Sequence, residues 1–204
     1  IEKMAAEERE YAEKHGLNIY TYLNELALES KPGSNGLYFY PYLLGERAPL
    51  WNEYARGMFI GIGMDMTRAD LVRSVFEGTA YALRHVMETV KASGAKADVL
   101  RICGGGAKSR TWSMIKASML RMPVYLLDDK SGDVPVGDAL IVGHKVGVFS
   151  DLTEAVKQIV KVNEIIQPVD EWADAYDKLY PYYIEMYKHL DKDLKALRNT
   201  VEHL

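Results

Sequence analysis

Three consecutive glycines, Gly104 to Gly106, are the residues of this sequence whose types and spacing most clearly suit chemistry. They lie between a predicted strand and a predicted helix, with Ala107 and Ser109 just before the helix. Glycines let a backbone turn sharply and approach a ligand without interference from Cβ atoms. The helix directs its free N–H groups and the positive end of its dipole to the same place. Such a turn suits a nucleotide, but a tight strand-to-helix connection without a ligand explains three glycines equally well.

The spacing of these glycines matches neither of two well-known phosphate-binding motifs. A Walker A loop needs Gly, four residues and then Gly-Lys, and a dinucleotide fingerprint needs Gly-x-Gly-x-x-Gly. The pair Gly61-x-Gly63 is a weaker signal, which we interpret as close packing of a strand. The glycine pattern alone therefore does not assign a function.

Two charged loops are further candidate sites. Glu46-Arg47 is an adjacent acid–base pair between a glycine and a proline, which can shape a site but more often braces its own loop. The turn Asp128 to Asp133 is acidic and could attract Mg²⁺. We favour a solvated turn in which Asp133 caps the following helix.

Residues for acid–base or metal chemistry do not gather in the sequence. Cys103 has no evident base partner, and we interpret it as a core residue. The tail tyrosines are spaced by three and four residues and predict one packed helical face: Tyr176, Tyr180, Tyr183 and Tyr187. The histidines lack metal-ligand spacing: His15, His85, His144, His189 and His203. No residue stands out as a catalytic base.

Composition narrows the class of protein. The 204 residues are 48% hydrophobic and 26% charged, which is typical of a globular chain. A net charge of −4 and a pI near 5.8 argue against a nucleic-acid partner. No apolar run approaches the ~20 residues of a membrane span, so no membrane partner is expected. The single cysteine excludes an internal disulfide and favours a reducing, cytoplasmic setting.

The elements that must position the glycine turn alternate between strands and helices, which predicts an α/β fold with a partly parallel sheet. The expected organisation is an N-terminal helical segment and loop (1–36), an α/β core (37–150) and C-terminal helices (151–204). Strands are predicted at 37–43, 57–64, 99–103 and 124–127. Two helices are predicted within 1–30, and a third from the Thr67–Asp70 capping box to Gly94. Further helices are predicted at 108–121, 135–146 and 151–165, and a last one over 171–200 with an interruption at Pro181. The helix after Thr67 carries an apolar stripe that we expect to be buried: Leu71, Val75, Leu83, Val86 and Val90.

Several motifs together resemble one family, the FGGY carbohydrate kinases, with xylulokinase-like members the most similar. Gly57-x-Phe59-x-Gly61-Ile62, then seven residues and Asp70-Leu71-x-x-Ser74-Val75-Phe76-Glu77, resembles the family's C-terminal signature. Tyr40-Pro-Tyr-Leu-Leu-Gly-Glu-Arg-Ala-Pro49 and Ala55-Arg-Gly57 resemble two further segments. The run from Gly104 to Trp112 resembles the family's adenosine motif. These motifs occur in the family's order over roughly 36–149.

The resemblance implies the C-terminal domain of a two-domain sugar kinase with an actin-like, ribonuclease-H-like ATPase fold, here without its first strands. It implies ATP as cofactor, with the adenosine against Gly104, Gly105, Gly106, Ala107 and Ser109. The sugar, a ketose such as xylulose, and Mg²⁺ are expected to bind upstream parts of the protein that this sequence does not contain. The aspartate base is expected to belong to those parts too. The chain alone is therefore expected to be inactive, with none of its residues catalytic. Open sheet edges of an incomplete domain favour self-association, so a homodimer is expected.

The sequence departs from the family pattern at four positions. Met114 stands where Gln is usual, Ser118 where Asp is usual, Arg121 where Gly is usual, and Asp138 within a Leu-Gly-Ala-Ala segment. These departures keep an alternative open, a non-catalytic nucleotide-binding or interaction module derived from such a kinase. We expect Gly106→Val to abolish nucleotide binding by filling the space that a ligand would approach.

Overall fold

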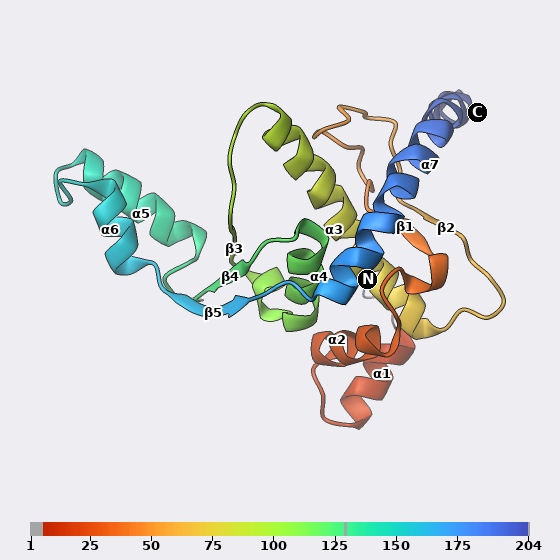
Figure 1. Ribbon diagram of the computed structural model, residues 1–204, viewed down its shortest axis with the longest axis horizontal. Helices are drawn as coiled ribbons and strands as arrows, with labels where there is room; N and C mark the ends of the chain where they lie inside the picture. The colour runs from red at the N-terminus through yellow and green to blue at the C-terminus, as the bar shows by residue number, and fades with distance from the viewer. Residues whose placement is uncertain (1–5, 129, 204) are drawn as a thin grey trace.

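The capping box at Thr67 and Asp70 begins helix α3 (Arg68–Ala92), the helix at the centre of the fold. The structure is a computed structural model that describes residues 6–128 and 130–203 (Figure 1). The Asp70 N–H donates to Thr67 Oγ1 at 3.3 Å, and the Thr67 N–H donates to the Asp70 carboxylate at 2.9 Å. Gly94, with a φ of 92°, follows the end of the helix. Both predicted ends of this helix are confirmed.

The buried face of α3 differs from the predicted apolar stripe. Leu71 and Val90 are exposed, whereas Arg73 and Glu77 are each only 1% exposed. The apolar stripe is therefore wrong as a prediction of the core-facing side. A buried ion pair is tolerated only when its hydrogen bonds are satisfied, and here neighbouring segments supply them.

The Arg73–Glu77 pair joins three parts of the chain. Arg73 Nε donates to Glu77 Oε1 at 2.6 Å. The Glu77 carboxylate also accepts from the Gly33 N–H at 3.0 Å and from the Ser34 hydroxyl at 2.8 Å, both in or next to η1 (Ser34–Gly36). The Tyr176 hydroxyl of α7 (Asp170–Glu202) donates to Glu77 at 2.8 Å. This network ties the N-terminal turn and the last helix to α3.

Tyrosines form the main core between α7 and a two-stranded sheet. Strand β1 (Tyr38–Tyr40) pairs antiparallel with β2 (Met58–Ile60). The Tyr40 hydroxyl donates to the Tyr183 carbonyl at 2.7 Å, and the two rings lie 4.5 Å apart. The four tail tyrosines are all buried, which confirms their predicted packing role. Both strands are shorter than predicted, because Pro41 follows β1 and the left-handed Gly61 follows β2.

Helix α7 runs without interruption through Pro181, contrary to the prediction. Proline inside a helix removes one hydrogen bond and costs about 3 kcal/mol. Tyr180 and Tyr183, on either side of it, are fixed in the core. Tertiary packing therefore outweighs the local cost.

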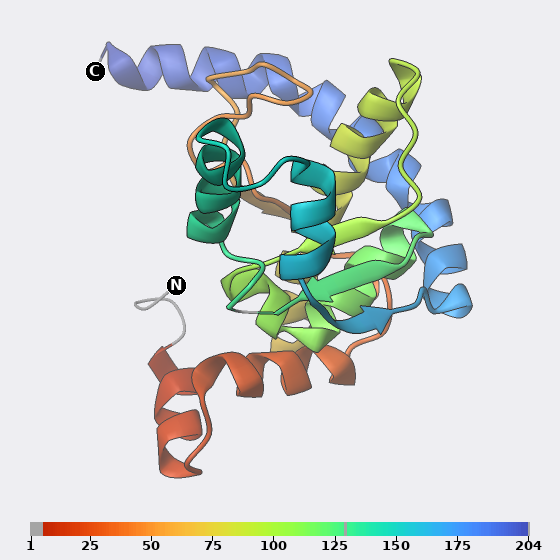
Figure 2. The same cartoon turned by 90° about the vertical axis from the view of Figure 1, so that its left-hand side faces the viewer.

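A second, three-stranded sheet carries the glycine turn (Figure 2). Strand β3 (Leu100–Ile102) pairs parallel with β4 (Val124–Leu127), and β4 pairs antiparallel with β5 (Val162–Ile166). Helix α4 (Arg110–Leu120) packs on this sheet through Ala117. The helix predicted at 151–165 is wrong in its second half, because α6 (Leu152–Ile159) ends early and β5 follows. The backbone groups of β5 are instead satisfied by antiparallel pairing with β4, a contact between distant segments that local sequence patterns do not reveal.

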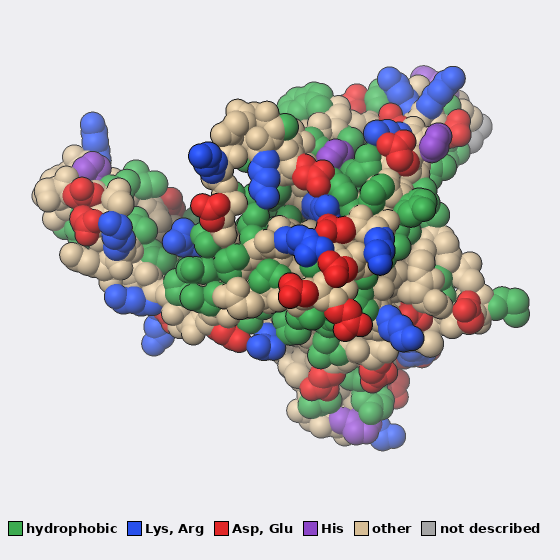
Figure 3. Space-filling view, in the orientation of Figure 1, with side chains coloured by type: hydrophobic (Ala, Val, Ile, Leu, Met, Phe, Trp, Pro, Cys, Tyr) green, Lys and Arg blue, Asp and Glu red, His purple; other side chains and the backbone are tan. Residues whose placement is uncertain are grey.

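The remaining helices lie at the two sides of the molecule. Helix α1 (Ala6–Lys14) and helix α2 (Ile19–Glu29) pack together, and α2 contacts α3 and α4. Helices α5 (Val134–Lys145) and α6 project away from α3 at the left of Figure 1. Figure 3, in the orientation of Figure 1, shows acidic and basic side chains interspersed on the face toward the viewer. Among the described residues, no helix combines the length and apolar character needed to cross a membrane.

Candidate functional site at the glycine turn

The three glycines form the connection from β3 to α4, as predicted. Gly104 has a φ of 72°, a left-handed conformation that favours glycine, and it precedes the short helix η2 (Gly105–Lys108). The Ala107 N–H donates to the Gly104 carbonyl at 3.0 Å and closes the turn. Ser109 then caps α4, because its hydroxyl accepts from the Trp112 N–H at 3.0 Å. The turn and the N-terminus of α4 therefore form one continuous surface.

The space around the turn is open at two glycines and closed at the third. A Cβ atom added to Gly104 or Gly105 would meet no other atom within 4 Å. A Cβ atom on Gly106 would lie 3.3 Å from the Trp112 ring, which is tighter than ordinary packing. Gly106→Val would therefore press on Trp112 besides filling ligand space. Gly105 is the better position for a substitution that tests ligand binding, because its φ is not in the left-handed region and an added side chain meets no neighbour.

Ala107 and Ser109 contribute mainly to the shape of the turn. Ala107 is buried, and the Ser109 hydroxyl donates to Asn24 of α2 while it caps α4. A hollow of about 280 Å³ adjoins the turn on the side of β4 and β5. It is lined by Ala107, Lys108, Arg110, Leu126, Leu127, Asn163 and Glu164. Within it Arg110 Nε donates to the Glu164 carboxylate at 3.0 Å, so the two charges pair across the hollow.

Trp112 and Lys116 lie behind the turn on α4. Trp112 Nε1 donates to the Thr79 hydroxyl at 2.9 Å and to the Phe76 carbonyl at 3.2 Å, which fixes the indole against α3. Lys116 Nζ lies 3.7 Å from the centre of the indole ring. Burial lowers the pKa of Lys116 to about 8. Sequence reasoning missed Lys116, because a lysine within a helix ordinarily indicates a solvated face.

The two charged loops have structural roles. The Glu46 carboxylate accepts from the Ala48 N–H at 3.0 Å, which confirms bracing of its own loop. Asp128 accepts from the N–H groups of Lys130 and Ser131, each at 3.0 Å, and Asp133 caps α5. Among the described residues no group of three or more His, Cys, Asp or Glu could hold a metal ion.

Cys103 is exposed beside the glycine turn, so its interpretation as a core residue is wrong. Strand β3 ends at Ile102, and the chain leaves the sheet before Cys103 can be covered.

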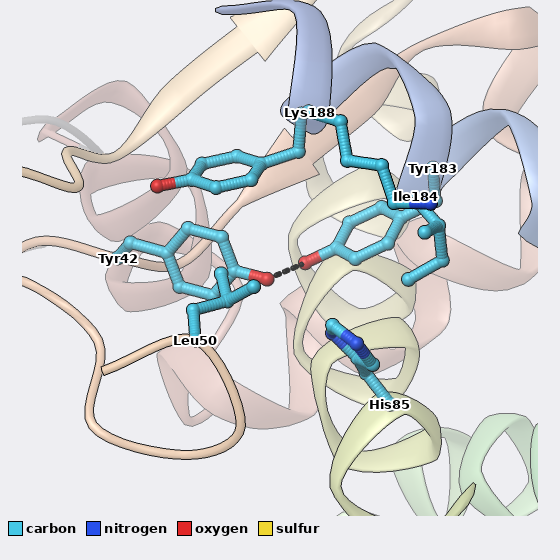
Figure 4. Close-up of a pocket in the computed structure, with 7 residues that line it drawn as sticks. Tyr42, Leu50, His85, Tyr183, Ile184 and Lys188 are labelled. Carbon is cyan, nitrogen blue, oxygen red and sulfur yellow. Dashed lines mark hydrogen bonds between the residues drawn. The ribbon is translucent and has the colours of Figure 1, made fainter. Parts of the chain in front are cut away.

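A second hollow, of about 100 Å³, lies far from the turn between α3, α7 and the loop after β1 (Figure 4). The Tyr183 hydroxyl donates to the Tyr42 hydroxyl at 3.0 Å along one wall. His85 points into the hollow, and burial lowers its pKa. Its Nδ1 atom is buried without a hydrogen-bond partner among the described residues. The space is small and mostly aromatic, so it does not compete with the glycine turn as a nucleotide site.

The arrangement of elements in this chain is shared with solved structures of sugar kinases. Solved structures with the same arrangement of elements include gluconate kinase from Lactobacillus acidophilus (TM-score 0.78, 25% identity, 87% of this chain and 36% of that chain). Xylulose kinase from Rhodospirillum rubrum has a TM-score of 0.75 at 32% identity, over 87% of this chain and 35% of that chain. The fold is thus the actin-like, ribonuclease-H-like ATPase fold of sugar kinases.

Residues 2–145 match the C-terminal domain of the FGGY family of carbohydrate kinases, and the chain belongs to this family. The xylulose kinase of Staphylococcus epidermidis RP62A is 36% identical over 177 residues, which cover 85% of this chain. The chain spans 36% of the length of that relative.

Two departures from the family pattern have clear structural roles. The Ser118 hydroxyl accepts from the Val169 N–H at 3.0 Å, directly before α7, so it joins α4 to the last helix. Arg121 takes a left-handed φ of 49° at the end of α4, and its guanidinium pairs with Asp174 and Asp177 of α7. Asp138 is exposed on α5. Its carboxylate therefore does not lie in the core.

Proposed function

We propose that this chain is the ATP-binding portion of a sugar kinase that transfers the γ-phosphate of ATP to a sugar hydroxyl. The observation that carries the proposal is the open glycine turn at the N-terminus of α4, in a chain of the FGGY family. Gly104 and Gly105 leave room for the backbone to meet a ligand. The α4 N-terminus adds a positive electrostatic potential that favours phosphate.

The residues of this chain would bind and orient the nucleotide. ATP supplies the phosphoryl group, and Gly104, Gly105, Gly106, Ala107 and Ser109 are the proposed contacts of its adenosine side. The family relation supports ATP as the cofactor. Mg²⁺ and the base that accepts the hydroxyl proton are proposed to lie in the upstream part of the kinase. We therefore expect the chain alone to bind nucleotide without turnover.

The proposed substrate class is a ketose such as xylulose or a related sugar acid. Two similar proteins are described as a xylulose kinase and a gluconate kinase. The sugar would be held by the upstream domain. A cytoplasmic setting, a homodimer and the division into 1–36, 37–150 and 151–204 stay predictions.

A calorimetric titration with ATP and ADP, with and without Mg²⁺, tests the proposal. We expect weak, saturable binding that depends little on Mg²⁺. Gly105→Val should abolish it, because the side chain occupies open space beside the turn. Gly137→Val on α5 is the matched control, since a Cβ there also meets no atom within 4 Å.

Equal affinities for Gly105→Val and the wild-type chain would refute the assignment of this turn. Absence of binding by the wild-type chain, and by a protein that includes the upstream domain, would favour the alternative of a non-catalytic interaction module.

A further inference from the structure

Lys116 is a largely buried lysine whose ammonium group has no charged partner in the described part of the chain. The residue is 9% exposed, yet no carboxylate or hydroxyl partner faces its ammonium group within the ranges that the structure describes. Its one described polar contact is the face of Trp112, with Nζ 3.7 Å from the ring centre. An ammonium group has three N–H donors, and the described residues supply no hydrogen-bond acceptor for them. The geometry therefore leaves donors for a ligand.

The lysine side chain reaches back toward the glycine turn. Lys116 lies seven residues after the cap Ser109, but side chains in a helix lean toward its N-terminus. Nζ lies 3.8 Å from the position that a Cβ on Gly106 would take. Trp112 cannot swing away easily, because its indole is hydrogen-bonded to α3. The amine is therefore held behind the turn by its surroundings.

The charge around the turn favours an anion. Lys108 ends η2 and Arg110 begins α4, and Glu164 is the acidic residue that lines the adjoining hollow and pairs with Arg110. The positive end of the α4 dipole adds to this potential. Lysine binds phosphate as a compact point charge.

We propose that Lys116 is a phosphate-binding residue of the glycine turn, its ammonium group donating to a phosphate oxygen of the bound nucleotide. The inference rests on the proposed nucleotide site and adds to it a residue that the five turn residues did not include. It accounts for a lysine at a buried position of α4, where an apolar side chain would pack without cost.

Titration with ADP and with adenosine tests the proposal, because the two ligands differ only in the phosphates. Lys116→Met should weaken ADP binding about ten- to a hundredfold, the usual worth of a hydrogen bond to a charged group. Adenosine affinity should change less than about twofold. Lys145→Met, which removes one exposed lysine charge from α5, should leave both affinities unchanged. Circular dichroism of each variant verifies folding.

Equal weakening of ADP and adenosine, or unchanged ADP affinity, would overturn the role of Lys116. If the wild-type chain binds neither ligand, the proposed nucleotide site fails, and the inference is then decided by chemical labelling. Acylation of Lys116 would be followed by peptide mapping, with and without inorganic phosphate. Slower labelling in phosphate would support an anion contact at Lys116, and equal rates would refute it.

Discussion

Replacing Lys116 with methionine should stabilise the chain at neutral pH, and the gain should shrink as the pH rises. Burial lowers the pKa of Lys116 from 10.5 to about 8 in the folded chain. Methionine has a similar length and no charge, and its sulfur packs well against aromatic rings such as that of Trp112. The substitution therefore removes a desolvated charge while it keeps most of the packing.

The sign follows from proton linkage. Below pH 8 the amine is charged in both the folded and the unfolded chain, and the folded chain bears the full cost of burial. Between pH 8 and 10.5 the folded chain has released a proton that the unfolded chain retains, so the cost declines as pH rises. The two pKa values correspond to roughly 3 kcal/mol at pH 7.

The contact with Trp112 offsets part of that cost. A desolvated cation–π contact is worth about 1–2 kcal/mol. The expected net gain of Lys116→Met is therefore about 2 kcal/mol at pH 7, falling below about 1 kcal/mol at pH 10.

Urea unfolding of the wild-type chain, Lys116→Met and Lys145→Met at both pH values measures these gains directly. Lys145 is exposed, so its replacement should change the free energy of unfolding little at either pH. A loss of stability in Lys116→Met at pH 7, or an equal gain at both pH values, would refute the reasoning.

Two further substitutions test the core. Glu77→Gln should lower the free energy of unfolding by at least about 3 kcal/mol, because it leaves Arg73 buried without its charge partner. Glu88→Gln, at the same spacing from its own arginine but half exposed, should cost less than about 1 kcal/mol, and equal losses in urea unfolding would contradict the argument. Tyr183→Phe should cost about 1 kcal/mol by removing its 3.0 Å hydrogen bond to a second buried tyrosine. Thermal unfolding should show no comparable change for Tyr182→Phe, since Tyr182 is exposed, and similar shifts for both would count against a role for the hydroxyl.

Local signals in the sequence predicted much of the fold. The caps at Asn18, Thr67 and Asp133 begin helices where they were expected, because a cap depends on residues within one turn. Strand β4 has the predicted bounds, and the glycine turn connects a strand to a helix as expected. The motifs also identified the family, since their order and spacing are properties of the sequence.

Contacts between distant segments decided the features that sequence reasoning got wrong. Residues 162–166 form a strand because β4 lies beside them, although they were predicted to continue a helix. The buried face of α3 is polar because η1 and α7 bring hydrogen-bond partners to Arg73 and Glu77. Proline at position 181 is tolerated because tyrosines on both sides of it are packed in the core.

The sequence by itself determined the family, through the order and spacing of its motifs. It also determined the strand-to-helix connection at the glycines and most helix ends, because these depend on short-range steric preferences and hydrogen bonds. Only the tertiary structure showed that Gly105 faces open space while Gly106 faces Trp112. It also showed that Lys116 is buried behind the turn rather than solvated. Burial depends on which segments meet in space, and residues such as Phe76 and Trp112 meet only when α3 and α4 pack together.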